Sequence, residues 1–406
     1  MGVAAMADAA QVVIVGAGPT GLTLALLLVQ RGISVKLIEA SRNFRRSFRG
    51  EGLMPNGLDA LEQMDLLSTV QQIPHQTLDA WTFLINDQVL FRADEPFEKG
   101  GRATQLVSQP ALLEQLIIQA QAYPHFEWIQ GVAVQDLLWR SDRVCGVQLA
   151  NTRHIEADLV IGADGRRSVV RQKANLPFQA FDAPFNLLWF QLADHPRFAQ
   201  ENIFYSILKD EHAFGLFRSS EGHLQIGWTL RDPTADWKNK RWDQELIAAS
   251  PPWFAEHLRS QVATLEPPVL LSVKVGRCAS WHQPGVLLLG DAAHPMSPLR
   301  AQGINMALRD VIVAANHLVP VLRQNGSLAE VDAVLPQIQA EREPEIRRSQ
   351  RLQHHEAMLA HRLSHSGMLR YALGRLSPML AAPIRQSWLR RQRALRAGSA
   401  LVRLIV

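Results

Sequence analysis

The sequence of 406 residues predicts an α/β domain on a parallel sheet, an antiparallel sheet inserted into it, and a helical C-terminal region. Three observations support this fold class. Near the N-terminus, a β-branched run, a glycine-rich turn, an apolar helix and a second short strand follow one another in βαβ order. Between residues 184 and 230, strand-like runs replace the helical patterns. Beyond about Asp332, the pattern is helical almost throughout.

The elements follow from local patterns. The first βαβ unit is predicted over residues 11–15, 20–30 and 34–38, with Gly32 ending the helix. Further helices are predicted from apolar residues at helical spacing over 56–67, 111–122 and 302–322. Short buried strands are predicted over 159–161 and 286–289, with a hairpin within 132–149. The strands of the inserted sheet are predicted over 185–192, 203–208, 213–217 and 224–230.

This order divides the chain into six segments. The α/β domain is predicted to comprise residues 9–74, 106–178 and 276–330. The inserted domain is predicted to comprise residues 75–105 and 179–275. Residues 331–406 form the basic C-terminal region, in which helices are expected to break near Pro344 and Pro378.

Composition excludes several classes of protein. Hydrophobic residues make up 47% and charged residues 20%, so the chain is neither disordered nor collagen-like nor a coiled coil. The only two cysteines, Cys145 and Cys278, exclude a disulfide scaffold and favour a reducing, cytoplasmic location. The histidines lack metal-ligand spacing, so no metal site is expected, and no nucleic-acid partner is predicted.

The charge is distributed unevenly. The formal net charge is +4, yet residues 341–406 carry 13 arginines and four glutamates, so this tail is at +9 and the remainder at −5. Residues 9–30 carry no charge, but glycines and a proline in their middle indicate a strand, turn and helix rather than a membrane span. No targeting segment is evident.

The first chemical motif is Gly16-Ala17-Gly18-Pro19-Thr20-Gly21, with the GxGxxG spacing. The first glycine allows a sharp turn, the second a close approach of pyrophosphate, and the third tight packing of helix on strand. The helix N-terminus offers free N–H groups to phosphates. Glu39 ends the next strand and is placed to accept both hydroxyls of an adenosine ribose.

Two further motifs have the same architecture of a strand that ends in glycine and aspartate. One is the run from Ala157 to Gly165, which contains Asp164. The other is the run from Val286 to Pro295, which contains Gly290-Asp291. Glycine at the bend allows close backbone approach, and a carboxylate accepts hydrogen bonds from ligand hydroxyls.

With these three motifs in order, residues 11–318 resemble the class A flavin-dependent aromatic hydroxylases, which include the polyprenylphenol hydroxylases of quinone synthesis. The resemblance implies an FAD-binding, Rossmann-like domain of the glutathione-reductase type. It implies that the GxGxxG loop and Glu39 bind the adenosine diphosphate of FAD. It implies that Asp164-Gly165 contacts FAD and NAD(P)H, and that Gly290-Asp291 holds the ribityl chain. The cofactor contacts expected in total are Gly16, Gly18, Pro19, Thr20, Gly21, Glu39, Arg49, Gln109, Asp164, Gly165, Gly290, Asp291, Gly303 and Asn305.

Some of these contacts come from weaker matches. Arg49 resembles the arginine of the family near the FAD phosphates, and Gln109 matches a position that touches the cofactor. A solvated surface side chain stays an alternative for both. The run from Pro298 to Asn305 resembles the loop that faces the flavin pyrimidine ring, with Ala301 where glycine is usual. If that position needs a positive φ, Ala301 is strained.

The resemblance implies a monooxygenase in which NADPH or NADH, bound transiently, reduces the flavin. O₂ then adds to give a C4a-hydroperoxyflavin, which hydroxylates or epoxidises an apolar aromatic, quinone-precursor or polyenic substrate. Aromatic residues of the inserted sheet alternate, so about half could face a pocket, while most belong to the core and about one in three is expected to line the substrate; they are Phe185, Trp189, Phe190, Phe204, Tyr205, Phe214, Phe217 and Trp228. No catalytic acid or base is assigned, and His75 and Tyr205 are only candidates.

Alternatives stay open for the function and for the tail. The same fold could serve a flavin-dependent reductase or dehydrogenase, or a membrane-peripheral flavin-binding protein. Residues 379–395 mix Leu, Ile and Trp388 with arginines, which suits contact with an anionic membrane surface. In the other interpretation, the tail is a helical pair packed on the FAD domain, with its arginines in water. The oligomeric state is left open.

Overall fold

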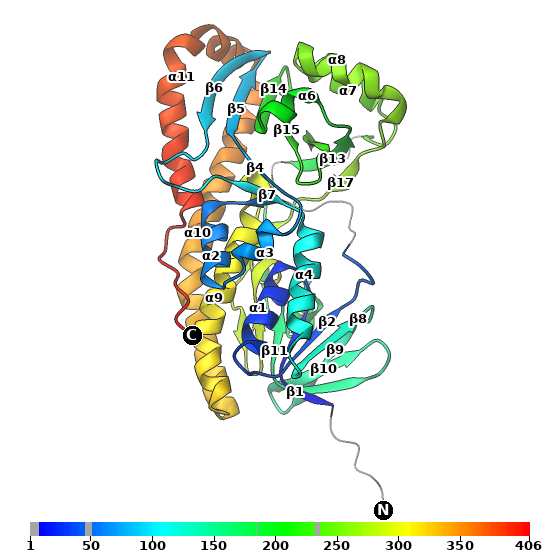
Figure 1. Cartoon of the computed structure of the whole chain (residues 1–406), viewed down its shortest axis with the longest axis vertical. Helices are drawn as coiled ribbons and strands as arrows, with labels where there is room; N and C mark the ends of the chain where they lie inside the picture. Colours follow the sequence, from blue (N-terminus) through cyan, green and yellow to red (C-terminus); the bar gives the residue numbers. More distant parts are fainter. Residues whose placement is uncertain (1–7, 45–50, 184, 231, 233–235) are drawn as a thin grey trace, which may run out of the picture.

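The computed structural model describes residues 8–44, 51–183, 185–230, 232 and 236–406. The molecule is elongated, with the α/β domain and the N-terminal end below and a second sheet above in Figure 1. The two long C-terminal helices run along one side of the molecule. They therefore connect the two ends of the structure.

An eight-stranded sheet forms the centre of the α/β domain. Its main path is β19 (His282–Gln283), β20 (Val286–Leu288), β11 (His154–Gly162), β1 (Ala9–Val15), β2 (Val35–Glu39) and β8 (Phe126–Gln130). The strands from β20 to β8 are parallel, while β19 is antiparallel to β20. A hairpin of β9 (Val134–Arg140) and β10 (Arg143–Leu149) extends from β11. Val12, Val13 and Ile14 of β1 are fully buried, as a central parallel strand requires.

Helices cover this sheet and place the motifs. The apolar helix α1 (Pro19–Val29) lies between α4 (Gln109–Gln121) and α9 (Gln302–Arg323). The helix expected over 56–67 is wrong in its extent, because the first helix ends at Gln63 and a second one begins at Leu67. Asp65 adopts a positive φ of 59°, which ends the first of them. The smaller helices of the domain are α2 (Pro55–Gln63), α3 (Leu67–Gln71) and α5 (Val169–Lys173).

The second sheet has seven strands and lies beyond the carboxyl edge of the first. Its order is β17 (Val269–Leu271), β13 (Asn186–Leu192), β16 (Leu224–Leu230), β15 (His212–Arg218), β14 (Ile203–Lys209), β5 (Ala80–Ile85) and β6 (Gln88–Asp94). All pairs are antiparallel except β14 with β5, which is parallel. One face packs on α6 (Pro196–Gln200), α7 (Trp242–Ala249) and α8 (Pro252–Gln261) through a buried cluster that includes Phe190 and Trp228.

Two small sheets and three short 3₁₀ helices complete the part before the C-terminal helices. Strands β3 (Gly52–Leu53), β7 (Gln105–Val107) and β4 (His75–Thr77) form one small sheet. Strands β12 (Phe178–Phe181) and β18 (Val275–Cys278) form an antiparallel ribbon at the junction with the second sheet. The 3₁₀ helices are η1 (Val262–Thr264), η2 (Gly290–Ala292) and η3 (Leu299–Ala301).

The C-terminal helices differ from expectation in where they break. Helix α10 (Leu328–His365) runs through Pro344, and α11 (Gly367–Arg396) runs through Pro378. The predicted breaks are wrong, because the chain turns instead at Ser366, which leaves helical dihedrals and caps α11 by accepting a bond from Leu369 N. Among the described residues, no helix combines the length and the hydropathy that a transmembrane span needs.

Helix α11 packs mainly across β6 of the second sheet, and its C-terminal end also contacts the α/β domain, where Asn56 Nδ2 of α2 donates to Leu395 O at 3.1 Å. Trp388 is only 4% exposed and contacts the rings of Phe83, Phe91 and Phe97. The expectation that Trp388 lies at a membrane interface is therefore wrong. Its ring fills the aromatic core between α11 and the sheet, since burial of so large an apolar surface is favourable there.

Candidate active site

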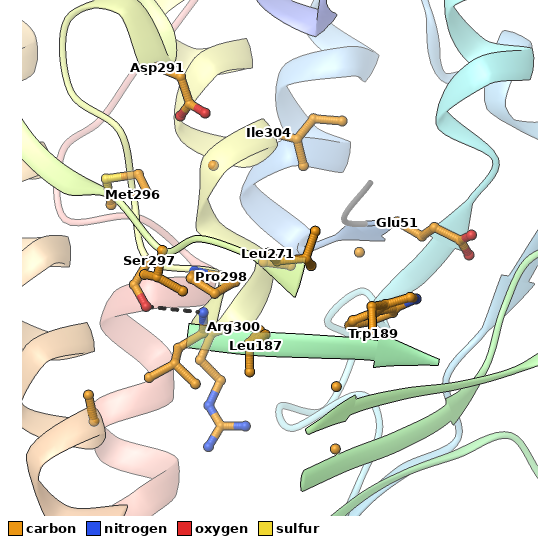
Figure 2. Close-up of a pocket in the computed structure, with 18 of the residues that line it drawn as sticks. Glu51, Leu187, Trp189, Leu271, Asp291, Met296, Ser297, Pro298, Arg300 and Ile304 are labelled. Carbon is orange, nitrogen blue, oxygen red and sulfur yellow. Dashed lines mark hydrogen bonds between the residues drawn. The ribbon is translucent and has the colours of Figure 1, made fainter. Parts of the chain in front are cut away.

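A cavity of about 1100 Å³ lies between the carboxyl edge of the parallel sheet and the second sheet. The glycine loop after β1 lines one end and the aromatic side chains of the second sheet line the other. Figure 2 shows Asp291, Pro298, Arg300 and Trp189 around this cavity. Ligand sites of open α/β sheets are expected at this edge, where parallel strands end.

The glycines around the cavity divide into two kinds. A Cβ on Gly16, which has a φ of +100°, would meet Ala163 O at 2.5 Å, and one on Gly21 would meet Gly16 O at 2.0 Å. These two glycines are required by packing of the protein itself. A Cβ on Gly18 would meet nothing within 4 Å, and one on Gly303 would meet only Asp291 Oδ1 at 4.0 Å. Both line the cavity, so protein packing does not explain them, whereas close approach of a cofactor does.

The N-terminus of α1 is suited to bind an anion. Gly18 is the N-cap and offers no side-chain cap, and Pro19 occupies the first turn, where its missing N–H costs nothing. Thr20 lines the cavity beside them. Backbone N–H groups of the first turn therefore face the space where a diphosphate fits.

Glu39 is held at the end of β2 by backbone contacts. Its Oε2 accepts a bond from Ala17 N at 2.9 Å, and its Oε1 accepts one from Ser41 N at 2.9 Å. The side chain is 8% exposed and lines the cavity. A carboxylate at this position, facing the cavity, is of the type that accepts bonds from ribose hydroxyls.

The two motif aspartates have different surroundings. Asp164 accepts bonds from Val169 N at 2.6 Å and Val170 N at 3.1 Å, so it also caps α5. Asp291 lines the cavity beside the start of α9. Burial raises the pKa of both carboxyls, and Arg166 opposes that rise at Asp291. A ligand hydroxyl donated to Asp291 would offset part of this cost of burial.

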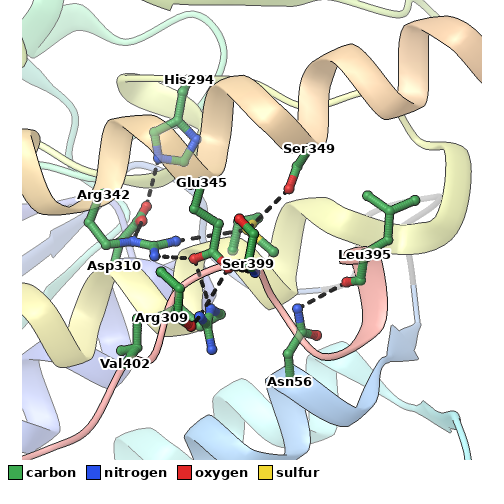
Figure 3. Close-up of polar contacts among 12 residues, drawn as sticks. Asn56, His294, Arg309, Asp310, Arg342, Glu345, Ser349, Leu395, Ser399 and Val402 are labelled. Atoms are coloured by element: carbon green, nitrogen blue, oxygen red, sulfur yellow. Dashed lines mark hydrogen bonds and ion pairs between the residues drawn. The ribbon is translucent and has the colours of Figure 1, made fainter. Parts of the chain in front are cut away.

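Behind Asp291, a buried ionic network anchors the turn that carries it. A Cβ on Gly290 would meet Thr20 Oγ1 at 2.4 Å, so this turn packs directly on α1. Asp310 of α9 accepts bonds from Gly290 N at 3.2 Å, from His294 Nε2 at 2.7 Å and from Arg342 Nε at 2.7 Å (Figure 3). Burial alone would raise the pKa of Asp310, but His294 and Arg342 hold it below its ordinary value.

The network extends to the end of the chain. Glu345 contacts Arg342 and accepts a bond from Arg309 Nε at 3.0 Å. Glu345 Oε1 also accepts Ser399 N at 2.8 Å, and Arg309 Nη2 donates to Ala400 O at 2.6 Å (Figure 3). The C-terminal residues are thus part of the support of the site.

The loop before α9 is strained, as expected for Ala301, whose φ is +49°. Arg300 shares this left-handed conformation with a φ of +60°, which sequence reasoning missed. Asn305 holds the loop: its Nδ2 donates to Ala301 O at 2.6 Å and to Gly52 O at 3.0 Å, and its Oδ1 accepts Met54 N at 2.9 Å. With all these bonds made, Asn305 is turned into the protein and does not line the cavity.

The structure therefore brings most of the predicted site residues together. Those that line the cavity are Gly16, Gly18, Pro19, Thr20, Glu39, Gln109, Asp164, Gly165, Asp291 and Gly303. Gly21, Gly290 and Asn305 lie behind it, and Arg49 falls outside the described residues. His75 bonds Ile73 O, and the Tyr205 hydroxyl accepts a bond from Arg197. Neither lines the cavity, so neither is placed for catalysis.

The aromatic residues of the second sheet alternate as predicted. The cavity is lined by Phe185, Trp189, Phe204 and Phe217, whereas Phe190, Tyr205 and Trp228 belong to the opposite core; Phe214 borders the cavity but packs in that core, stacked on Trp228. Sequence reasoning missed Glu356 of α10 and Trp388 and Arg391 of α11, which also line the cavity. No motif marks these residues, because they reach the site only through packing of the C-terminal helices.

Comparison with known proteins identifies the family of the chain. Residues 9–349 match the family described as FAD binding domain. The chain is 33% identical over 352 residues to a 6-methylpretetramide 4-monooxygenase from Streptomyces rimosus, covering 84% of this chain and 82% of that protein. It is 27% identical over 344 residues to a p-hydroxybenzoate hydroxylase from Acinetobacter baylyi, covering 79% and 80%. Several other relatives are longer proteins, of which 53% to 60% is matched.

A solved structure shows the same fold. The p-nitrophenol 4-monooxygenase from Pseudomonas putida superposes with a TM-score of 0.79 over 98% of this chain and 100% of that chain, at 18% identity. Fold and site thus define a flavin-dependent oxidoreductase. The chain belongs to the FAD binding domain family and is an FAD-dependent monooxygenase of the aromatic hydroxylase group. A specific kinship with the polyprenylphenol hydroxylases stays a prediction.

Proposed function

We propose that the protein inserts one atom of O₂ into an apolar aromatic substrate, with NADPH or NADH as electron donor. One observation carries this proposal: a single cavity joins the glycine loop and Asp291 to the aromatic face of the second sheet. A flavin held at the first end would present its reactive edge to a substrate held at the second. Hydroxylation of an aromatic ring or epoxidation of a polyenic chain would both use this arrangement.

In this proposal, the chain holds FAD through its backbone and three carboxylates. The α1 N-terminus takes the diphosphate, Glu39 takes the adenosine ribose, and Asp291 takes a ribityl hydroxyl. FAD, when bound, supplies the hydride acceptor and the activation of O₂. In the same proposal, Asp164 and Gly165 contact both FAD and the transient nicotinamide cofactor.

The protein contributes orientation and exclusion of water at the substrate end. Trp189, Phe204 and Phe217 form one aromatic wall, with Phe204 and Phe217 stacked at 5.6 Å between ring centroids. Residues Ser297 to Ala301 form another wall at the flavin end. A largely apolar cavity disfavours water around the reacting groups and favours a flat aromatic substrate.

The test is incorporation of ¹⁸O₂ by the FAD-loaded enzyme. A panel of phenols, quinone precursors and polyenes is screened for stimulated oxidation of NADPH and of NADH, and the products are weighed by mass spectrometry. One ¹⁸O atom per product supports the proposal. A reduced product without ¹⁸O would instead establish a reductase, and hydrogen peroxide without any product would contradict monooxygenation of the panel.

The first half of α11 supports one further proposal, contact with an anionic membrane surface. Met368, Tyr371 and Met379 are 80%, 68% and 78% exposed, and their spacing places them on one helix face. After Glu356 the chain contains nine arginines and no acidic residue. All charged residues of α11 are arginines, and an apolar face on such a helix fits an anionic lipid surface.

Co-sedimentation with vesicles tests this contact. We expect binding to phosphatidylglycerol vesicles that falls as salt rises and is lost in the triple variant Met368→Ser/Arg375→Gln/Met379→Ser. Phosphatidylcholine vesicles serve as the control. Equal binding to both vesicles, or self-association of the protein through this face, would contradict the proposal.

A further inference from the structure

Arg300 has a backbone conformation that disfavours any residue with a side chain. Its φ of +60° and ψ of +26° lie in the left-handed region, where glycine is the unstrained choice. The loop is held in place by Gln353, which donates to Ser297 O at 2.9 Å and to Leu299 O at 2.6 Å. A strained arginine in a firmly held loop implies that its side chain contributes something that glycine cannot.

The side chain extends from the flavin end of the cavity into an aromatic box. Its Cζ lies 5.3 Å from the ring centroid of Trp81, 5.5 Å from that of Phe83 and 5.2 Å from that of Trp388. Its Nε donates to Glu356 Oε2 at 2.8 Å. Three ring faces and one carboxylate therefore fix the plane of the guanidinium.

The other edge of the guanidinium is available to a ligand. Arg300 Nη1 and Nη2 donate no hydrogen bond to any described residue, while Arg300 lines the cavity. Glu356 is shared, because its Oε1 accepts Gln392 Nε2 at 2.5 Å and lies 3.9 Å from Arg391 Nε. Two arginines and one carboxylate leave this corner of the cavity with an excess positive charge.

We propose that Arg300 is a substrate-binding residue whose Nη groups donate to an acidic oxygen, a phenolate or carboxylate, of an aromatic substrate. The rings of the substrate lie against Trp189, Phe204 and Phe217, across the cavity from the flavin loop. This inference rests on the proposed function and names the class of substrate. Because the loop of Arg300 also faces the flavin end, the same residue sets the position of the substrate relative to the cofactor.

The experiment measures binding without turnover. The FAD-loaded protein is titrated with 3-hydroxy-2-naphthoate, which is anionic, and with 3-hydroxy-2-naphthamide, its neutral counterpart, by the change in flavin absorbance and in tryptophan fluorescence. We expect the wild type to prefer the anion by at least tenfold. Arg300→Gln should weaken binding of the anion roughly ten- to a hundredfold and leave binding of the amide within about twofold.

Two variants separate binding from folding. Arg300→Lys keeps the charge and should retain part of the preference, and its flavin content reports whether the loop is intact. Arg385→Gln removes an exposed arginine of α11 outside the cavity and should bind both probes as the wild type does. A wild type without preference for the anion, or equal losses for both probes in Arg300→Gln, would overturn the inference. Either result leaves the ¹⁸O₂ test of monooxygenation unaffected.

Discussion

Replacement of Arg342 by methionine tests the buried network that supports the flavin site. Arg342 is fully buried, contacts Glu345 and donates to Asp310 at 2.7 Å. Removal of the cation leaves Arg309 and His294 as the side-chain partners of these two carboxylates, beside the backbone N–H groups of Gly290 and Ser399. Breaking a buried ion pair by removing one partner costs about 3–5 kcal/mol, because an uncompensated charge stays buried.

This loss of stability predicts a measurable decrease in the melting temperature. An unfolding entropy of about 2.1 cal/mol/K per residue corresponds to about 0.85 kcal/mol/K for this chain. Arg342→Met should therefore lower Tm by about 4–6 °C, measured by calorimetry of the FAD-loaded protein. Since Asp310 also holds Gly290 N, the variant should retain less FAD on gel filtration.

Arg347→Met is the matched control on the same helix. Arg347 pairs with Glu343 one turn away, but its side chain is 56% exposed. An exposed pair of this kind contributes about 0.3–0.5 kcal/mol, so Tm should change by less than about 1 °C. Adding Glu345→Gln to Arg342→Met should recover part of the loss, because the excess negative charge is removed. If Arg342→Met melts within 1 °C of the control, the reasoning about buried charge is refuted.

Three further outcomes are expected. Glu39→Ala removes the acceptor of the adenosine ribose and should weaken FAD binding ten- to a hundredfold by equilibrium titration, since bonds to a charged group contribute about 1.5–3 kcal/mol; unchanged affinity, or FMN in the purified protein, would contradict the assignment. Ala301→Gly relieves a φ of +49° and should raise the free energy of unfolding, measured in urea, by about 0.5–1 kcal/mol. A decrease in the free energy of unfolding would show that packing of the Ala301 methyl group stabilises the protein more than the backbone strain destabilises it. Burial raises the pKa of the Cys278 thiol to about 11. Above its ordinary value of about 9, the unfolded chain ionises first, so stability should fall as pH rises from 9 to 11, by up to about 2–3 kcal/mol, and Cys278→Ala should lack this part of the fall.

Much of the fold could be predicted because its signals are local. The strand Leu224–Leu230 lies where alternation of apolar residues places it, and α9 begins at Gln302 as expected. The glycine spacing at Gly16 and Gly21 predicts a turn whose close contacts leave no room for a side chain. Patterns of this kind depend on neighbours along the chain, so the sequence reveals them directly.

Predictions from local sequence patterns were wrong where contacts between distant elements determine the structure. Pro344 and Pro378 predicted helix breaks, yet each helix continues, and the turn occurs at Ser366. The parallel pairing of β14 with β5 joins strands more than a hundred residues apart, and no local pattern predicts which neighbours pair. Packing against neighbouring elements can offset the backbone bond that a proline removes, and such offsets are invisible in the sequence.

The sequence by itself determined the cofactor class and the carboxyl-edge location of the site, because glycines and aspartates at strand ends are tied to phosphate and hydroxyl binding. Which side chains from distant elements line the rest of the cavity was determined only by the tertiary structure. Arg300, Trp81 and Trp388 lie about 90 to 310 positions apart along the chain, yet their side chains meet in one cavity. Such a contact forms when distant elements pack together. The hydrophobic effect that drives this packing is non-directional, so it leaves no local pattern in the sequence.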